Sequence, residues 1–141
     1  MAVRPLHSIY QVDPYLFRDS TGRGWGTLDG VTEKLDYLQW LGVSHVWLLP
    51  FYRNAGRDGG YDVTDHYRID PRLGDDAAFQ RLIDAAHARG IGIIAELIMQ
   101  HTASAHPWFA AAQQGDPHWR PWYLWSDEVP DDGLQLSLIH I

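Results

Sequence analysis

The sequence predicts an α/β fold with a parallel sheet. Short apolar runs alternate with amphipathic helical segments in the order strand, helix, strand, helix, strand, and the crossovers are long enough only for parallel pairing. The clearest run, Ile91 to His101, follows a helix stop at Gly90 and carries polar residues toward its carboxyl end. Because ligands bind at the carboxyl ends of parallel strands, this run is predicted to lead into a binding site. Three strands do not close a barrel, so both sheet edges are expected to be open.

The first half of the chain contains two predicted strands and one predicted helix. Residues Ser8 to Val12 form the first strand, and four glycines make Asp19 to Gly30 a loop. Thr32 is predicted to cap a helix with leucines at helical spacing, which ends at Gly42. His45 to Leu49 is the second short apolar strand.

The second half begins with a long predicted loop from Phe51 to Gly74. Asp75 and Asp76 favour a helix N-terminus, and apolar residues at helical spacing carry that helix to Gly90. After the third strand, Pro107 to Gln114 is predicted to be a short helix opened by its proline.

Composition narrows the class of protein. The 141 residues are 45% hydrophobic and 21% charged, as in globular proteins. A net charge of -7 argues against a nucleic-acid or anionic-membrane partner. The absence of cysteine excludes a disulfide framework and thiolate metal sites. No apolar run is long enough for a signal peptide or a membrane span, and we expect a cytoplasmic protein.

The segment after the second strand, Arg57 to Asp62, combines two glycines with two carboxylates and a ring. A carboxylate such as Asp58 accepts hydrogen bonds from hydroxyls, and a ring such as Tyr61 packs on the C–H face of a pyranose. These residues therefore suit sugar binding. The alternative interpretation is an ordinary hydrogen-bonded turn.

Two further polar residues belong to the third predicted strand. His101 ends it, either as a site residue or as a structural histidine, and its spacing from His106 is wrong for a helical zinc pair. Glu96 is placed near the middle of the strand. A buried carboxylate must be paired or catalytic, and pairing with an arginine is the expectation.

The loop from Asp19 to Thr27 has the alternate-residue spacing of a calcium loop. Its intervening alternate positions are Thr21, Arg23 and Trp25. One carboxylate beside an arginine cannot replace the hydration of a divalent cation, so this loop is predicted to bind no calcium.

Six blocks of sequence together resemble the N-terminal part of the α-amylase superfamily of retaining α-glucoside enzymes. They occur in one order within roughly residues 8–128, and the resemblance is greatest to the trehalose synthase (maltose glucosyltransferase) branch. This resemblance implies that the chain forms the first three βα steps of a (β/α)8 barrel. The blocks are Ile9 to Val12, Thr32 to Leu38 with Leu41 to Val43, Trp47 to Tyr52, Asp58 to Asp65, Gln100 to Thr102, and His106 to Phe109.

The resemblance implies roles for individual residues. Asp58 matches the aspartate that holds hydroxyls 4 and 6 of the glucose before the cleaved bond, which implies a closed pocket and a short substrate such as maltose. Tyr61 matches the ring that stacks on this glucose, and His101 matches the histidine that hydrogen-bonds its O6. Asp62 and Asp65 match acidic positions that are mainly structural.

Two positions depart from the family pattern. Glu96 stands where the family usually has aspartate, and Gln100 stands where it usually has asparagine. Each side chain is one methylene longer than the family residue. That asparagine often holds calcium or orders the loop beside the histidine, so the departure at Gln100 bears on this function; calcium is left as an alternative for the parent protein.

The family mechanism uses a nucleophilic aspartate and an acid/base glutamate about 5 to 5.5 Å apart, with a second aspartate. The resemblance places all three beyond residue 141, so the 141-residue chain is expected to be inactive alone. Residues 1–133 are then a truncated catalytic barrel. Residues 134–141 are expected to be a non-native tail, because Leu136 to Ile141 matches one reading frame of a common sequencing adaptor.

The resemblance leaves three functional hypotheses open. The first is a parent enzyme that isomerises maltose to trehalose by glucosyl transfer. The second is an exo-acting α-glucosidase or α-amylase-type hydrolase. The third, from another class, is a non-catalytic sugar-binding module. No cofactor is expected, and the sequence does not indicate an oligomeric state.

Overall fold

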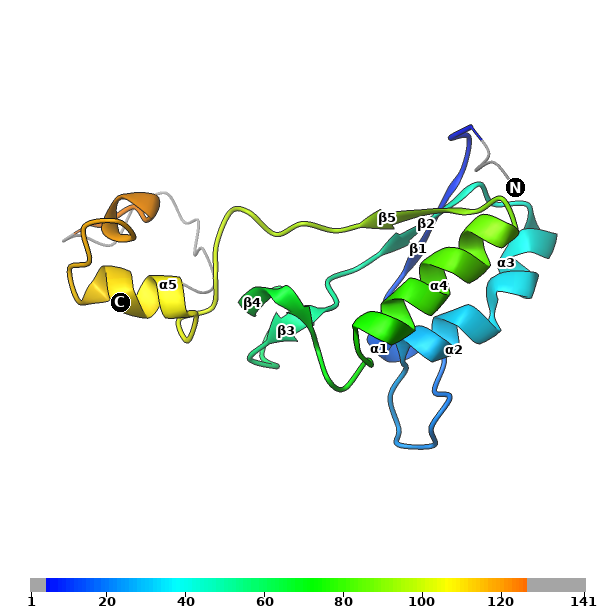
Figure 1. The fold of residues 1–141 in the computed structure, drawn as a ribbon, viewed down its shortest axis with the longest axis horizontal. Coiled ribbons are helices and arrows are strands. Elements are labelled where there is room, and N and C mark those ends of the chain that lie inside the picture. The colour runs from blue at the N-terminus through cyan, green and yellow to red at the C-terminus, as the bar shows by residue number, and fades with distance from the viewer. Residues whose placement is uncertain (1–4, 127–141) are drawn as a thin grey trace.

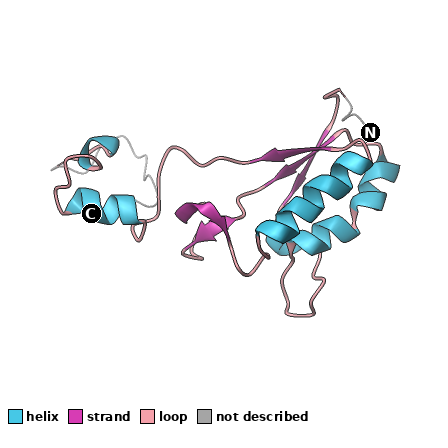
Figure 2. Ribbon diagram, viewed as in Figure 1, coloured by secondary structure: helices cyan, strands magenta, loops and turns pink. Residues whose placement is uncertain are grey.

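The computed structural model describes residues 5–126, so the expected tail at residues 134–141 lies outside the described part (Figure 1). The chain combines short strands with helices (Figure 2). The elements are β1 (Ile9–Val12), α1 (Pro14–Phe17), α2 (Leu28–Glu33), α3 (Leu35–Leu41), β2 (His45–Leu48), β3 (Tyr52–Asn54), β4 (Val63–Ile69), α4 (Asp76–Ala88), β5 (Gly92–Ala95), α5 (Pro107–Gln113) and the 3-10 turn η1 (Arg120–Trp122).

The main sheet has the strand order β1-β2-β5, and both pairings are parallel. Val12 lies beside Leu48, and Leu48 lies beside Ala95, so the three strands end in register. The α/β fold with a parallel sheet is therefore confirmed. Within the described residues β1 and β5 form open edges, and the sheet does not close into a barrel.

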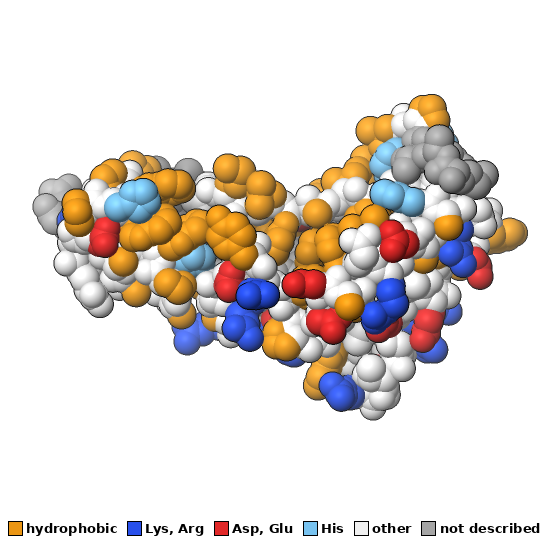
Figure 3. Space-filling model, viewed as in Figure 1, with side chains coloured by type: hydrophobic (Ala, Val, Ile, Leu, Met, Phe, Trp, Pro, Cys, Tyr) orange, Lys and Arg blue, Asp and Glu red, His pale blue; other side chains and the backbone are white. Residues whose placement is uncertain are grey.

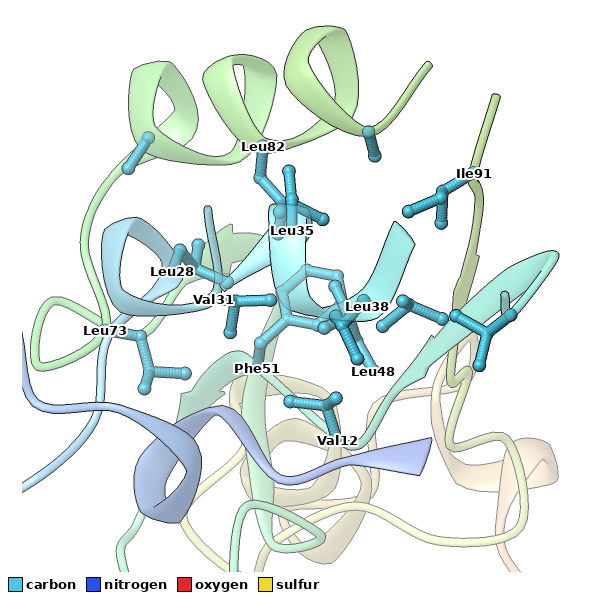
Figure 4. Packing of buried hydrophobic residues seen from close by; sticks show 14 residues of the cluster. Val12, Leu28, Val31, Leu35, Leu38, Leu48, Phe51, Leu73, Leu82 and Ile91 are labelled. Carbon is cyan, nitrogen blue, oxygen red and sulfur yellow. The ribbon is translucent and has the colours of Figure 1, made fainter. Parts of the chain in front are cut away.

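One face of the sheet is covered by α2, α3 and α4, with α4 packed along α2 (Figure 1). Alternate strand residues such as Val12, Val46 and Leu48 point into this core, as a two-residue period requires. The helices supply further apolar side chains with no exposed surface (Figure 4), namely Leu28, Val31, Leu35, Leu38 and Leu82.

The helical segments differ from the prediction at their start. Thr32 does not cap the predicted helix, which is α3 and has Lys34 at its N-cap. Thr27 caps the preceding helix α2, because its Oγ1 accepts a hydrogen bond from the Gly30 amide at 2.9 Å. Thr32 lies inside α2. The close approach of α1 explains Gly30, since a Cβ there would overlap the carbonyl oxygen of Arg18. Helix α1 was not predicted.

The segment from Phe51 to Gly74 was predicted to be a loop, and this prediction is wrong. It contains an antiparallel hairpin of β3 and β4, and the amide of Asp70 donates to the Phe51 carbonyl at 2.9 Å at its base. The polar, half-exposed residues of β4 lack the apolar alternation by which a strand is predicted.

The predicted strand Ile91 to His101 is much shorter in the structure. Only β5, Gly92–Ala95, pairs with β2, and the chain then runs in extended form to α5 (Figure 1). The predicted caps and helices further along are confirmed: Asp75 caps α4 by accepting from the Ala78 amide at 2.7 Å, and α5 starts at Pro107. Among residues 5–126 none of the helices has the length and apolarity that a bilayer crossing requires.

Candidate functional site

The carboxyl ends of the three parallel strands deliver two carboxylates to one edge of the sheet. Asp13 follows Val12 and Glu96 follows Ala95, and these strand ends are in register through Leu48. Asp13 was not among the predicted site residues, although it stands at a strand end just as His101 was expected to. Asp13 also caps α1, because its Oδ1 accepts from the Tyr15 amide at 2.9 Å.

The loop between β3 and β4 carries Asp58 at its tip. The amide of Ala55 donates to the Asp62 carbonyl at 3.0 Å and closes the loop, while the Tyr61 amide donates to the Asp58 carbonyl at 2.9 Å. The Asp62 side chain, only 1% exposed, accepts from the Arg57 amide at 2.8 Å. Asp62 therefore shapes the loop. Within the described residues the carboxylate of half-buried Asp58 is not used in these turn bonds.

Gly60 fixes the loop against the strand end. Its φ is +97°, in the region that favours glycine, and an added Cβ would lie 2.7 Å from the carbonyl oxygen of Pro50. A side chain at this position would lift the loop away from β2. The neighbouring Gly59 has no atom within 4 Å of its added Cβ.

His101 and Tyr61 lie together although forty positions separate them. The Nε2 of His101 is 3.1 Å from the carbonyl oxygen of Tyr61. A carbonyl only accepts, so Nε2 carries the proton, and in the neutral ring Nδ1 is an acceptor. This hydrogen bond connects the segment after β5 to the loop after β3.

Glu96 lies beside Tyr61 at the edge. Burial raises the pKa of Tyr61, and the negative charge of Glu96 raises it further. Glu96 lies just past the end of β5 and is half-buried, so its placement in the middle of the strand was wrong. The expected arginine partner stays a prediction, since the ion pairs among residues 5–126 do not include Glu96. Its Oε2 is buried and has no hydrogen-bond partner in this part of the chain.

The two remaining predicted residues, Asp65 and Gln100, do not take part in the hydrogen bonds that hold the Asp58 loop within residues 5–126. The Oδ1 of Asp65 accepts from the Tyr67 amide at 2.8 Å, a local contact within β4. Gln100 is exposed in the extended segment beside His101.

A cluster of rings joins the hairpin to α5. The rings of His66 and Trp108 stack with centroids 5.5 Å apart, and those of His66 and His106 are 5.3 Å apart. The Nδ1 of His106 accepts from the Trp108 amide at 3.1 Å and so caps α5. His66 Nε2 donates to the Ile98 carbonyl at 3.0 Å. Hydrophobic side chains continue from the middle of the molecule over the lobe that contains α5 (Figure 3).

The loop with calcium-like spacing is organised by its one carboxylate. Asp19 accepts backbone hydrogen bonds from Thr21, Gly22 and Gly24 at 2.7 to 2.8 Å, and those from Gly24 and Thr21 contribute most to lowering the pKa of Asp19. Both carboxylate oxygens are thus engaged by the loop itself. Across residues 5–126 no group of three or more His, Cys, Asp or Glu side chains is arranged to hold a metal ion.

Comparison with known proteins agrees with this architecture. The family model for the alpha amylase catalytic domain matches residues 11–135. The chain is 48% identical over 119 residues to the trehalose synthase/amylase TreS of Mycolicibacterium smegmatis, covering 84% of the chain and 20% of that protein. It is 41% identical over 124 residues to the oligo-1,6-glucosidase of Heyndrickxia coagulans, covering 87% of the chain and 22% of that protein.

A solved structure shows the same arrangement of elements. The trehalose-6-phosphate hydrolase of Bacillus licheniformis superimposes with a TM-score of 0.81 at 40% identity, covering 87% of this chain and 22% of that one. The chain thus spans about a fifth of the length of the relatives that it matches. The family match and these identities show that the chain belongs to the α-amylase catalytic-domain family and forms the N-terminal βα steps of its (β/α)8 barrel.

Proposed function

We propose that this chain supplies the glucose-holding side of the active-site pocket of an enzyme that acts on small α-glucosides. The observation that carries the proposal is the hydrogen bond from His101 to the Tyr61 carbonyl, which holds the two segments together beside Asp58. A carboxylate, an aromatic face and a histidine acceptor then converge at the carboxyl edge of the sheet, where barrel enzymes bind substrate.

Each of the three residues has a distinct role in this proposal. Asp58 accepts hydrogen bonds from two hydroxyls at the non-reducing end of the sugar, since its carboxylate is not used in the turn bonds of the loop. The ring of Tyr61 stacks on the apolar face of the pyranose. The Nδ1 of His101 accepts from a further hydroxyl, because Nε2 already donates to the protein.

For the complete enzyme we propose trehalose synthase-like conversion of maltose to trehalose through a covalent glucosyl intermediate. In such a double displacement a carboxylate attacks the sugar, and the released glucose then reattaches through a different hydroxyl. Relatives that carry the name trehalose synthase support this proposal, at 46% and 48% identity. A closed pocket that excludes water would favour transfer over hydrolysis.

Hydrolysis of α-glucosides is the second candidate. The oligo-1,6-glucosidase of Heyndrickxia coagulans and the trehalose-6-phosphate hydrolase of Escherichia coli are 41% and 43% identical to the chain. These identities are close to those of the synthases, so the described residues suit either outcome. A cytoplasmic location stays a prediction.

A maltose titration of the 15N-labelled chain, followed by NMR, tests the sugar contacts. We expect the amide signals of Gly59, Tyr61 and Thr102 to shift with maltose, and Asp58→Ala to abolish these shifts. Asp36→Ala is the matched control, since Asp36 is an exposed carboxylate on α3 that pairs with Arg89. Identical titrations of the Asp58→Ala and Asp36→Ala chains would contradict the proposal.

A turnover assay separates a partial from a complete active site. We expect the purified 141-residue chain to release no glucose and form no trehalose from maltose, because we propose that the attacking and protonating carboxylates belong to later strands of the barrel. Turnover above background that Asp58→Ala abolishes would show that this chain is itself an enzyme.

A further inference from the structure

A polar network that the proposed sugar contacts do not use lies beneath the Asp58 loop. Asp70, only 2% exposed, accepts from Arg72 Nε at 2.9 Å on one oxygen and from Arg72 Nη2 at 2.7 Å on the other. The same Nη2 donates to Asn54 Oδ1 at 2.7 Å. Asn54 Nδ2 donates to Asp70 Oδ2 at 3.0 Å and to the Tyr15 hydroxyl at 2.8 Å. The network therefore connects α1, β3 and the end of β4.

The network contacts the loop at its first turn. The Oδ1 of Asn54 accepts from the Gly56 amide at 2.9 Å. Gly56 has a φ of +74°, and a Cβ added there would lie 3.3 Å from Nη1 of Arg72. The loop backbone thus rests on the guanidinium, two residues before Asp58.

On the side of the loop that faces this network, a cavity rather than packed apolar side chains lies against the loop backbone. The cavity has a volume of about 240 Å³ and separates the glycines of the loop from the turn after β1. Opposite the glycines it is lined by Asp13, Tyr15, Asn54 and Arg72. A glycine-rich loop beside an open cavity has many alternative conformations, so directional hydrogen bonds must select one.

The charges of the network suit a permanent support. Burial opposes ionisation of Asp70, but the hydrogen bonds from Arg72 outweigh it and lower the pKa of Asp70. Burial raises the pKa of Tyr15 to about 12, so its hydroxyl stays protonated. The guanidinium also lies over the Tyr15 ring at 5.1 Å from the centroid.

We propose that Arg72, acting through Asn54, is a positioning residue that holds the Asp58 loop in its sugar-binding conformation. The inference rests on the proposed function for the identity of the ligand, whereas the ordering of the loop is independent of it. Arg72 itself touches no sugar in this role. Its guanidinium fork is needed because one side chain must bind both oxygens of Asp70 and the amide oxygen of Asn54 at once.

The test compares Arg72→Met with Arg81→Met in the 15N-labelled chain. Arg81 is a suitable control because it also binds an aspartate, Asp29, with two nitrogens, but does so between α4 and α2. We expect Arg72→Met to speed hydrogen exchange of the Gly56 and Arg57 amides by about tenfold. This factor corresponds to the loss of roughly one hydrogen bond. Maltose affinity should fall by a similar factor. Arg81→Met should change neither, and Arg72→Lys should recover only part of the loss.

Asn54→Ala provides a second route to the same answer if Arg72→Met does not fold. It removes the acceptor of the Gly56 amide and leaves the ion pair of Arg72 with Asp70 in place. Faster exchange confined to the loop supports the proposal. Loop exchange equal to that of Arg81→Met, in Asn54→Ala alone where Arg72→Met does not fold, overturns it.

The two proposals fail in distinguishable ways. If the unaltered chain shows no maltose shifts but Arg72→Met still frees the loop, the sugar function fails and the positioning role stands. If maltose binds and Asp58→Ala abolishes binding while Arg72→Met changes neither exchange nor affinity, the positioning role fails and the sugar function stands.

Discussion

The helix-covered half of the molecule and the carboxyl edge of the sheet are held together by different forces. Between the sheet and α2, α3 and α4, fourteen buried apolar residues form one continuous cluster (Figure 4). At the edge, the Asp58 loop, His101 and the start of α5 are joined by individual hydrogen bonds and stacked rings. The first half tolerates small shifts in position, whereas the second depends on the placement of single atoms.

Because of this difference, we expect the core to determine the stability of the fold and the edge to determine sugar binding. Burial of apolar area is non-directional and scales with the area removed from water, so the core stabilises the fold without selecting a loop conformation. A hydrogen bond adds little net free energy but fixes geometry within a few tenths of an ångström. Substitutions in the core should therefore act on unfolding, and substitutions at the edge should act first on the shape of the site.

Leu82→Ala should have the largest effect. Leu82 in α4 has no exposed surface and belongs to the main buried cluster, so its truncation leaves a cavity there. We expect a loss of about 2 to 5 kcal/mol in the free energy of unfolding, measured by urea denaturation. Leu16→Ala is the control, since Leu16 is 82% exposed and should change this value by less than about 0.5 kcal/mol.

Gly60→Ala should have the next largest effect and should change the edge of the sheet. The added methyl would meet the Pro50 carbonyl oxygen at a backbone φ of +97°, which costs about 1 to 3 kcal/mol unless the loop moves. We expect the loop to move, and the hydrogen bond between His101 and the Tyr61 carbonyl to be lost. NMR signals of the His101 ring report this directly.

Gly59→Ala is the matched control for that substitution. Its φ of +55° lies in the left-handed region that an alanine can enter, and its added Cβ meets no atom within 4 Å. The His101 ring signals should stay unchanged. Equal effects of the two substitutions would show that backbone preference, rather than contact with the Pro50 carbonyl, decides the conformation of the loop.

Acid should weaken the ring cluster at the start of α5. Burial and the neighbouring His66 lower the pKa of His106 below its ordinary value of 6.5, whereas Asp65 opposes this shift. The unfolded chain therefore binds a proton more readily than the folded chain. The stabilisation by His106 is complete above about pH 6.5 and is lost as the pH falls below this value. Protonation at Nδ1 would also remove the acceptor for the Trp108 amide.

His106→Asn tests this pH dependence. Asparagine caps a helix without titrating, so the variant should lose less stability on acidification than the unaltered chain. Urea unfolding followed by tryptophan fluorescence across the acidic range measures the difference. His118→Asn should keep the original pH dependence, because His118 is exposed.

The sequence allowed the main sheet to be predicted because its strands are short apolar runs bounded by glycine and proline. The hairpin was missed for the opposite reason. Residues Thr64, Asp65 and His66 in β4 are polar and half-exposed, and their hydrogen bonds to β3 depend on a turn whose glycines also suit a plain loop. A pattern of hydrophobicity does not detect a strand that buries little apolar surface.

The candidate site shows the same limit. Strand-end position selected His101, and the residue types of the loop, together with resemblance to the family, selected Tyr61 and Asp58; their sugar contacts stay predictions. The position of Glu96 beside Tyr61 could not be predicted, because it depends on how the segment after β5 lies against the loop after β3. Likewise the contact between Arg72 and Asn54 joins residues eighteen positions apart across the hairpin, and only the pairing of β3 with β4 brings them together.

The smallest expected effect concerns Arg81, and it sharpens the contrast between the halves. Arg81 and Asp29 form a two-nitrogen ion pair like that of Arg72 and Asp70, but both side chains are about half exposed, whereas the side chain of Asp70 is 3% exposed. An exposed pair gains little in water and is screened by salt, so Arg81→Met should cost less than about 1 kcal/mol, measured by urea denaturation. High salt should abolish this cost. A larger, salt-resistant loss would mean that the helix-covered half also depends on directional contacts, and the distinction between core and edge would not hold.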